Sequence, residues 1–429
     1  MACVRKRNNS YRIEIFLGRD ANGKQIRYTE TYKPSEKGKR GKQEAIAYAN
    51  TLETKYRQGQ IMLGEKYTLA SFVARWKEGQ AFKKLGPRSQ FQYCHDLEEF
   101  FLPILGNVQI DKIRVMDIDN IILQLDNGKR NAHTINKIID SLNNVMKYAV
   151  KKKVINYNPI ECCDRPTEKH SQKDIAFTPK QINEFLDFLT EPYTINYKEH
   201  KSKSPKSGKE FTVQAYSKEY TVPLMFRAFF WIAVATGCRR GELCALKWED
   251  IDFTDNTIDI NKGIASVPGK GQFESTTKTE YSNRVISVPQ KAMDILKAWR
   301  KEEYQIMLSY GDAWQGHFQD DFEKNYVFIQ SFGKVINVDT PYHEMKKIIK
   351  RYNEKYKGVK EPLPSYPLNG LRHTEASLVN FILVDDKANA RRMGHSTPTT
   401  TMKYYISAYK EQDVKIAKQL DNLLTASPL

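Results

Sequence analysis

The sequence predicts a mainly α-helical protein with small antiparallel sheets, an α+β fold, and three observations carry this prediction. Alternating apolar and polar residues near the start of the chain indicate two strands, at residues 11–16 and 25–29. From about residue 67 to residue 165, apolar residues recur instead at the spacing of amphipathic helices. The remainder is again helical in pattern, apart from short strand-like segments. These segments are residues 251–253, 257–260 and 284–288.

Length and charge define the broad class of protein. A chain of 429 residues corresponds to about three domains. Lys and Arg together number 68 and Asp and Glu 51, so the net charge is +17. An excess of this size favours a polyanionic partner, with nucleic acid as the leading candidate.

Composition excludes several other classes. With 40% hydrophobic and 11% aromatic residues, the chain has too much core-forming material for a disordered basic tail. No apolar run approaches the roughly 18 residues of a membrane span, and no apolar region follows the basic residues at the start. The six cysteines form neither a disulfide framework nor a CxxC pair, so we expect no metal and no cofactor. A soluble, intracellular protein is the simplest interpretation.

The first domain is predicted to span residues 1–64. Its two strands are joined by a turn at 20–23, a third extended piece is expected near 31–32, and a helix follows at 43–57. Residues 1–65 hold 14 Lys and Arg against 7 Asp and Glu. A small basic sheet backed by a helix is typical of a module that lays strands into a DNA groove; a solvated basic surface is the alternative. Candidate DNA contacts in the loop before the helix are Lys37, Lys39, Arg40 and Lys42.

The second domain, residues 65–170, is predicted to be a compact bundle of four helices. Thr68 or Ser71 caps the first, which runs through Trp76. The other three helices cover residues 89–101, 115–125 and 131–153. The last one ends in three lysines, which suit a helix C-terminus and are also candidate phosphate contacts. They are Lys151, Lys152 and Lys153.

The third predicted domain, residues 175–429, begins with a helix start at 177–179. An insertion around 190–222, rich in Lys, Ser and Tyr, is expected to form a long loop or a small excursion, and it carries no interpretable motif. A nearly unbroken apolar helix is predicted at 224–236 and a second helix at 239–248. The strand-like segments come next, and the rest of the domain is helical.

The first candidate catalytic residues lie where these two predicted helices meet. The run TGCRRGEL at 236–243 ends a buried helix with glycine and places Arg239 at the start of the next. Free backbone N–H groups and the helix dipole bind anions at such a position, and arginine adds a bidentate fork. Glu242, one turn further on, could orient the arginine. The alternative for this pair is an ordinary surface ion pair.

Three later motifs follow in the order LRHT at 371–374, MGHS at 393–396 and TTMKYY at 400–405. With these motifs the chain resembles the tyrosine recombinase family, the site-specific recombinases of the phage-integrase type. The resemblance to the catalytic domain covers residues 175–415. Residues 1–64 also resemble the family's arm-type DNA-binding domain, and residues 65–170 its helical core-binding domain.

The resemblance implies a catalytic set on matching positions. Arg239 and Arg372 match the two catalytic arginines, and Glu242 matches the acidic position that supports the first. Lys278 matches the lysine of the β-hairpin; Lys270 is the alternative, although no Thr follows it. His395 matches the histidine of the GHS turn.

The nucleophile is Tyr405 or Tyr404, because the family places it nine or ten residues after that histidine. The ten-residue spacing of integrases with three domains favours Tyr405.

Asn369 departs from the family pattern, which usually has histidine three residues before the second arginine. An amide can donate a hydrogen bond to a phosphate oxygen but cannot transfer a proton at neutral pH. Acid–base duty therefore falls to Lys278 and His395. His373 lies about 100° around the helix from Arg372 and is expected to be structural.

The resemblance thus implies an integrase of a phage or integrative mobile element, active in the cytoplasm of a bacterial host and nucleoid-associated when bound to DNA. It would cut and rejoin DNA through a 3′-phosphotyrosyl intermediate, with no ATP, metal or other cofactor. The implied partners are double-stranded DNA attachment sites of core and arm type, three further copies of the chain in a homotetramer, an excisionase and a DNA-bending host protein. The amphipathic C-terminal helix predicted at 411–424 would pack on a neighbouring protomer or on its own core.

Two rival functions belong to other classes. A DNA-binding regulator on the same fold would have a broken catalytic set, whereas only the position of Asn369 is altered. A nicking-closing topoisomerase would not need a separate basic domain at residues 1–64. An RNA-binding role would be favoured by exposed aromatic stacking motifs, and the sequence offers none.

Overall fold

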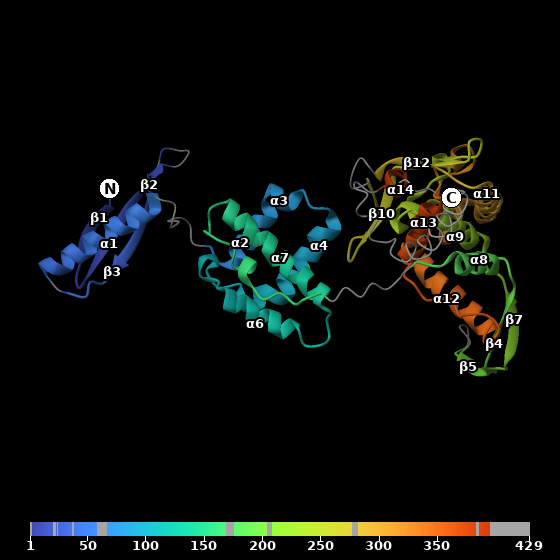
Figure 1. Cartoon of the computed structure of the whole chain (residues 1–429), viewed down its shortest axis with the longest axis horizontal. Coiled ribbons are helices and arrows are strands. Elements are labelled where there is room, and N and C mark those ends of the chain that lie inside the picture. Colours follow the sequence, from blue (N-terminus) through green and yellow to red (C-terminus); the bar gives the residue numbers. More distant parts are fainter. Residues whose placement is uncertain are drawn as a thin grey trace, which may run out of the picture. The chain divides into compact units, whose positions relative to one another are not determined.

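The computed structural model describes residues 2–19, 23, 25–36, 38–57, 67–168, 176–203, 208–276, 282–382 and 386–394. Two compact units divide the chain, residues 1–171 and 172–429 (Figure 1). Each unit is described by itself. The α+β class predicted from the sequence is confirmed by helices throughout both units together with small antiparallel sheets. The division into three domains stays a prediction.

A three-stranded antiparallel sheet with one helix opens the first unit. Its elements are β1 (Ala2–Arg7), β2 (Ser10–Arg19), β3 (Gln25–Tyr32) and α1 (Lys39–Arg57). The strand order is β1-β2-β3, and Ile13 and Ile15 of β2 pack with Ala49 of α1. The predicted three-stranded sheet with a helix is confirmed, although the extended piece expected near 31–32 is the end of β3 rather than the third strand. The strand missed was β1, because three consecutive cations, residues 5–7, hide its alternation.

Helices make up the rest of the described part of the first unit. They are α2 (Leu69–Glu78), α3 (Gln80–Lys83), α4 (Pro87–Asp96), the π-helical η1 (Leu97–Phe101), α5 (Leu102–Leu105), α6 (Val115–Leu125) and α7 (Ala132–Lys151), with short 3₁₀ turns η2 (Ile110–Lys112) and η3 (Pro159–Cys162). Thr68, rather than Ser71, caps α2, accepting a hydrogen bond from the Ser71 N–H at 3.2 Å. Asn131 caps α7 in the same way, with the Thr134 N–H at 2.8 Å. The apolar face of α7 lies buried at the centre of this core, as its periodicity predicts.

The second unit combines helices with a small sheet and a separate hairpin. The helices are α8 (Pro179–Phe188), α9 (Leu224–Thr236), α10 (Arg240–Ala245), α11 (Gln290–Tyr310), α12 (Thr340–Lys355), α13 (Asn369–Ile382) and α14 (Asp386–Met393). Short 3₁₀ turns are η4 (Trp248–Asp250), η6 (Gly311–Ala313), η7 (Gln319–Lys324) and η8 (Ser331–Gly333). The sheet has the order β12-β9-β8, from β8 (Ile251–Asp252), β9 (Thr257–Ile260) and β12 (Arg284–Ser287). The hairpin pairs β10 (Lys262–Val267) with β11 (Gly271–Thr276). The nearly all-apolar α9 lies in the middle of the core, packed against α11 and α13.

The insertion at 190–222 forms an arm of paired strands rather than a long loop. We call residues 193–220 the β-arm: β4 (Tyr193–Tyr197) pairs with β7 (Tyr216–Tyr220), and β5 (His200–Lys203) with β6 (Glu210–Val213). The arm extends from the helical body beside the end of α12 (Figure 1). The rings of Tyr197 and Tyr216 stack across it with centroids 4.6 Å apart. Cross-strand aromatic pairs of this kind supply the packing that alternating apolar residues supply elsewhere.

Among the helices that the structure describes, none is both long and apolar enough to cross a membrane.

Candidate active site

The turn between α9 and α10 depends on a glycine. Gly237 ends α9 in the left-handed region, with φ of 58°, where residues with a Cβ atom are strained. A Cβ atom there would also overlap the side chains of Met393 and Glu375. The close approach of α9, α13 and α14 at this point therefore requires glycine, and it brings Arg239 to the start of α10.

Glu242 orients Arg239, as the spacing of the two residues predicts. One carboxylate oxygen, Oε2, accepts from the backbone N–H of Arg239 at 2.9 Å, and the other, Oε1, accepts from Nη1 of its guanidinium at 2.8 Å. Burial by itself would raise the pKa of Glu242, but the charge of Arg284 and hydrogen bonds from both arginines lower it below its ordinary value. Glu242 is buried, whereas 42% of the Arg239 side chain remains exposed, so this is not an ordinary surface ion pair.

Arg372, in the first turn of α13, is buried next to Arg239. Its Nη1 donates to the carbonyl oxygen of Gly237 at 2.6 Å, and its Nη2 to that of Met393 at 2.5 Å. Arg239 reaches the same turn, because its Nη2 donates to the carbonyl oxygen of Gly394 at 3.2 Å. Burial and then the charge of Arg239 lower the pKa of Arg372 to about 10, so it stays protonated at neutral pH. Two cationic forks from distant segments thus converge on the turn at 393–394.

Two neighbours of Arg372 differ sharply in exposure. Asn369 is the first residue of α13 and is exposed, one turn before Arg372. His373 is buried, and burial followed by the charge of Arg372 lowers its pKa to about 4. It is therefore uncharged at neutral pH.

Several predicted catalytic residues lie outside the described residues. They are Lys278, His395, Tyr404 and Tyr405. Described segments precede two of them: α14 ends at Met393, two residues before His395, and β11 ends at residue 276, two residues before Lys278. Lys270, the alternative to Lys278, is exposed at the turn that joins β10 to β11.

Most predicted DNA contacts are exposed in the first unit. Lys39, Arg40 and Lys42 lie in the first turn of α1, while Lys37 falls outside the described residues. The lysines at 151–153 are all exposed at the end of α7. Lys153 has a positive φ of 56°, which turns the chain away from the helix axis.

Sequence reasoning missed a set of cations on the sheet itself. Arg5, Arg12, Arg19 and Arg27, which we call the sheet-face arginines, share with Phe16 the face of the sheet opposite to α1, where Glu14 pairs with Arg12 and Arg27. The cross-strand register places Arg5 opposite Arg12 and Phe16 opposite Arg27. Strand alternation could have separated these residues from the buried set of Tyr11, Ile13 and Ile15.

Sequence reasoning also missed two arginines beside the candidate active site. Arg284 in β12 donates from Nη2 to Oε2 of Glu242 at 2.9 Å, and Arg392 in α14 pairs with Glu375 at 2.6 Å. The alternation of β12 contained a signal, because Arg284 shares the inward face with Ile286. An arginine at an inward strand position indicates a buried ion pair.

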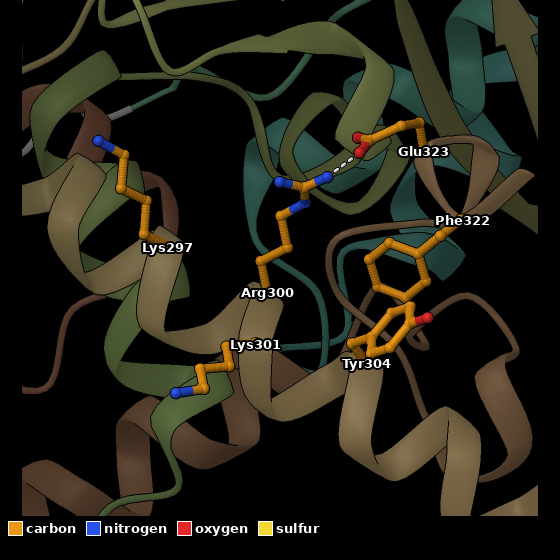
Figure 2. Close-up of a pocket in the computed structure, with 6 residues that line it drawn as sticks. All are labelled: Lys297, Arg300, Lys301, Tyr304, Phe322 and Glu323. Carbon is orange, nitrogen blue, oxygen red and sulfur yellow. Dashed lines mark hydrogen bonds and ion pairs between the residues drawn. The ribbon is translucent and has the colours of Figure 1, made fainter. Parts of the chain in front are cut away.

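Another pocket lies on α11 and η7, away from this set of residues. Figure 2 shows its lining, in which Arg300 pairs with Glu323 and the ring of Phe322 packs edge-on against Tyr304. Lys297 and Lys301 complete the lining. None of the predicted catalytic residues belongs to it. In the described part of the chain, no three His, Cys, Asp or Glu side chains gather as a metal site requires.

Comparisons with known proteins identify relatives of this chain. Residues 212–411 match the phage integrase family. The chain is 25% identical to a XerC-like tyrosine recombinase of Caldanaerobacter subterraneus subsp. tengcongensis, over 98% of each chain. It is 26% identical to the ICEBs1 integrase of Bacillus subtilis, over 68% of this chain and 66% of that one. It is 24% identical to the transposase from transposon Tn916 of Enterococcus faecalis, over 86% and 81%.

A solved structure shares the fold. The Tn1549 transposon integrase, determined in complex with a circular intermediate DNA, matches with a TM-score of 0.59 at 19% identity, over 82% of this chain and 99% of that one. The family match and the sequence relatives define the class of enzyme, the tyrosine-type site-specific recombinases. Residues 212–411 form a domain of the phage integrase family, and the chain is a tyrosine recombinase. It is a site-specific recombinase of the kind that mobile genetic elements encode.

Proposed function

We propose that this recombinase integrates and excises its element by two rounds of strand exchange through a 3′-phosphotyrosyl intermediate, with Arg239, Lys278, Arg372 and His395 as catalytic residues and Tyr405 as nucleophile. The observation that carries the proposal is the convergence of Arg239 and Arg372 on the carbonyl groups of residues 393 and 394. These carbonyl groups directly precede His395. Three segments of the proposed catalytic set therefore meet at one point.

An anion fits between these arginines for an electrostatic reason. Burial and then the charge of Arg239 lower the pKa of Arg372, so the buried Arg372 lies close to a like charge. A phosphodiester placed between the two forks relieves this repulsion, and each guanidinium can bind its non-bridging oxygens in a bidentate manner. Exposed Asn369, one helical turn before Arg372, can donate a further hydrogen bond.

Each step of the exchange forms one phosphoester bond for each one that it breaks. The oxygen of Tyr405 attacks phosphorus while the bond from phosphorus to the 5′-oxygen breaks. Lys278 protonates the departing 5′-oxygen, and His395 bonds the phosphate and assists removal of the tyrosine proton. A 5′-hydroxyl from the partner strand then attacks the phosphotyrosine and releases the enzyme. The energy of the phosphodiester is stored in the intermediate, so no ATP is required.

A trapped covalent intermediate tests the proposal. The substrate is a junction duplex, which carries the two joined ends of the element that encodes the chain and a nick that lets the short 5′-fragment leave after cleavage. We expect a covalent protein–DNA adduct that Tyr405→Phe abolishes and Tyr404→Phe retains. The reverse pattern would assign the nucleophile to Tyr404.

The same experiment separates the rival functions. If the unmodified chain binds the junction duplex but forms no adduct, it is a DNA-binding regulator. If it forms adducts equally on a scrambled duplex and only relaxes supercoils, it is a topoisomerase.

Residues 1–64 are proposed to bind arm-type DNA sites. The sheet-face arginines support this, because a three-stranded sheet can enter the major groove and present them to bases and phosphates. Lys39, Arg40 and Lys42 are suited to contact the flanking backbone. The slope of log K against log salt measures the phosphate contacts directly. Loss of one such contact, as in Lys42→Ala, should reduce that slope by about one unit. A replacement on the face of α1 that packs against the sheet should leave the slope unchanged.

Residues 65–170 are proposed to bind the core-type site, with Lys151, Lys152 and Lys153 on phosphates. Four copies on a four-way junction are proposed as the active assembly, in the cytoplasm of a bacterial host and bound to its nucleoid. Analytical ultracentrifugation with a synthetic four-way junction should give four chains per junction. An excisionase and a DNA-bending host protein are proposed as partners that set the direction of recombination.

A further inference from the structure

Arg284 lies directly behind the proposed catalytic arginines and has three strong acceptors. It is only 8% exposed. Besides Glu242, it donates from Nε to the carbonyl oxygen of Arg392 at 2.7 Å and from Nη1 to that of Ser282 at 2.9 Å. Its acceptors therefore belong to α10, to α14 and to the segment that leads into β12.

Arg392 is itself fixed from several sides. Its Nε pairs with Oε1 of Glu375 in α13 at 2.6 Å, and its Nη2 donates to the carbonyl oxygen of Ala235 at the end of α9 at 2.5 Å. A longer contact of 3.3 Å joins Nη1 to the carbonyl oxygen of Ser287 in β12. The carbonyl group that accepts from Arg284 is thus held in place by α9, β12 and α13 together.

These contacts close a ring through the candidate active site. Arg239 joins Glu242 to Gly394, and Arg284 joins the same Glu242 to Arg392, two residues before Gly394. Two arginines therefore connect the start of α10 to the turn before His395. A shift of Arg284 would therefore move the support of Arg239 and the turn relative to each other.

Burial of Arg284 has a cost that an apolar residue would not incur. Desolvation of a guanidinium costs several kcal/mol, and ion pairing offsets this only when the geometry is good. At an inward position beside Ile286, an aliphatic side chain would fill the core more simply. The planar fork of arginine is what allows one side chain to reach acceptors in three segments, and lysine cannot reproduce it.

We propose that Arg284 is a positioning residue for strand cleavage, which sets the Glu242 carboxylate, and through it the Arg239 guanidinium, against the turn at 392–394. The proposal rests on the proposed function, because the group it positions is a proposed catalytic arginine. It does not require Arg284 to touch DNA. A residue of this kind changes the rate of the chemical step and leaves substrate affinity unaltered.

The test uses the full-length chain and the junction duplex in two forms, one with the natural 5′-oxygen and one with sulfur in its place at the cleaved bond. Arg284→Lys retains the charge that balances Glu242 but loses the fork. Arg284→Gln, which keeps a donor without charge, is the second variant. Arg300→Lys is the matched control, since Arg300 also pairs with a carboxylate, Glu323, but on the pocket of Figure 2. Measurements are the Kd for the duplex, the single-turnover rate of adduct formation and the thermal unfolding midpoint.

We expect Arg284→Lys to bind the duplex with a Kd within about twofold of the unmodified chain and to form the adduct on the order of 100-fold more slowly, as a small misplacement of a catalytic group does. The loss should be equal for oxygen and sulfur, because a sulfur leaving group needs no proton and Lys278 is not the group displaced. Arg300→Lys should keep the full rate.

Three results would overturn the inference while the unmodified chain remains active. The first is a full rate of adduct formation in Arg284→Lys. The second is recovery of that rate with the sulfur substrate, which would assign the defect to the Lys278 segment. The third is failure of both Arg284 variants to fold, which would make Arg284 a structural residue. Absence of adduct from the unmodified chain is a different result. It refutes the proposed function and the inference with it.

Discussion

Replacing Glu303 with glutamine is expected to remove a large pH dependence from the stability of the second unit. Glu303 lies in α11 and is completely buried. Its Oε2 accepts from Nε1 of Trp248 at 3.2 Å, and Oε1 has no hydrogen-bond partner among the described residues. Burial raises the pKa of Glu303 to about 9, in spite of the hydrogen bond from Trp248. The side chain is therefore protonated in the folded protein at neutral pH.

The size and sign of the effect follow from proton binding. The unfolded chain releases this proton near pH 4, at the ordinary pKa of glutamate, whereas the folded chain keeps it up to about pH 9. Between these values the unfolded state binds fewer protons, so the free energy of unfolding falls by close to RT ln 10 for each unit that pH rises. From about pH 5.5 to about pH 8.5 the loss amounts to roughly 4 kcal/mol. Glutamine cannot titrate, and Glu303→Gln removes this loss.

Urea unfolding at about pH 5.5, 7 and 8.5 measures the free energy of unfolding of both chains. The signal is the fluorescence of the tryptophans, four of which lie in the second unit. The stability of Glu303→Gln relative to the unmodified chain should rise steadily with pH. The control is Glu302→Gln, an exposed neighbour on the same helix, which should follow the unmodified chain at each pH. Parallel pH profiles for Glu303→Gln and the unmodified chain would show that Glu303 is ionised in the folded state and would refute the reasoning.

Three further changes test other parts of the structure. Glu242→Gln should lower the free energy of unfolding by about 3–5 kcal/mol at pH 7 in calorimetry, because it leaves the arginines that Glu242 pairs with without their carboxylate. Since folding lowers the pKa of Glu242, this difference in stability should shrink as pH falls below about 4. A difference that stays constant with pH would contradict this. Gly237→Ala should cost about 1–3 kcal/mol through its positive φ, and more through overlap with Met393; an unchanged unfolding midpoint would show that the turn relaxes freely. Thr68→Ala should cost about 1 kcal/mol by removing the cap of α2, seen as faster hydrogen exchange in the first turn of that helix, and equal exchange would count against the cap.

Elements defined by local pattern could be predicted from the sequence. The apolar run 224–236 forms α9 with the predicted bounds, and the Thr-Pro start at 178–179 begins α8 with a capping box. Both depend on interactions within a few residues, which the sequence displays directly. The predicted second helix at 239–248 is shorter, because α10 ends at Ala245 and a 3₁₀ turn follows.

Elements defined by pairing over longer distances could not be predicted. The β-arm has few alternating apolar residues, and its strands are specified by stacked tyrosines that meet only after the hairpin forms. Arg284 and Arg392 were missed for a related reason, since an isolated arginine in a sequence has the pattern of a surface cation. Their acceptors are backbone carbonyl groups and carboxylates of distant segments, which only the folded chain brings within reach.

The way in which the proposed catalytic arginines are held has a consequence for the proposed chemistry. Arg372 is held by two carbonyl oxygens, which orient its guanidinium without neutralising it. Arg239 and Arg284 share the single carboxylate of Glu242, and the ion pair of Arg392 with Glu375 cancels. Among the described residues, these three arginines and Glu242 leave a local charge of +2, to which Lys278 of the proposed set would add. A phosphodiester carries one negative charge, whereas its pentacoordinate transition state, after attack by a tyrosine oxygen, approaches two. In the proposed reaction these groups match the charge of the transition state more closely than that of the bound substrate, and such a difference would accelerate the reaction where equally tight binding of both would not.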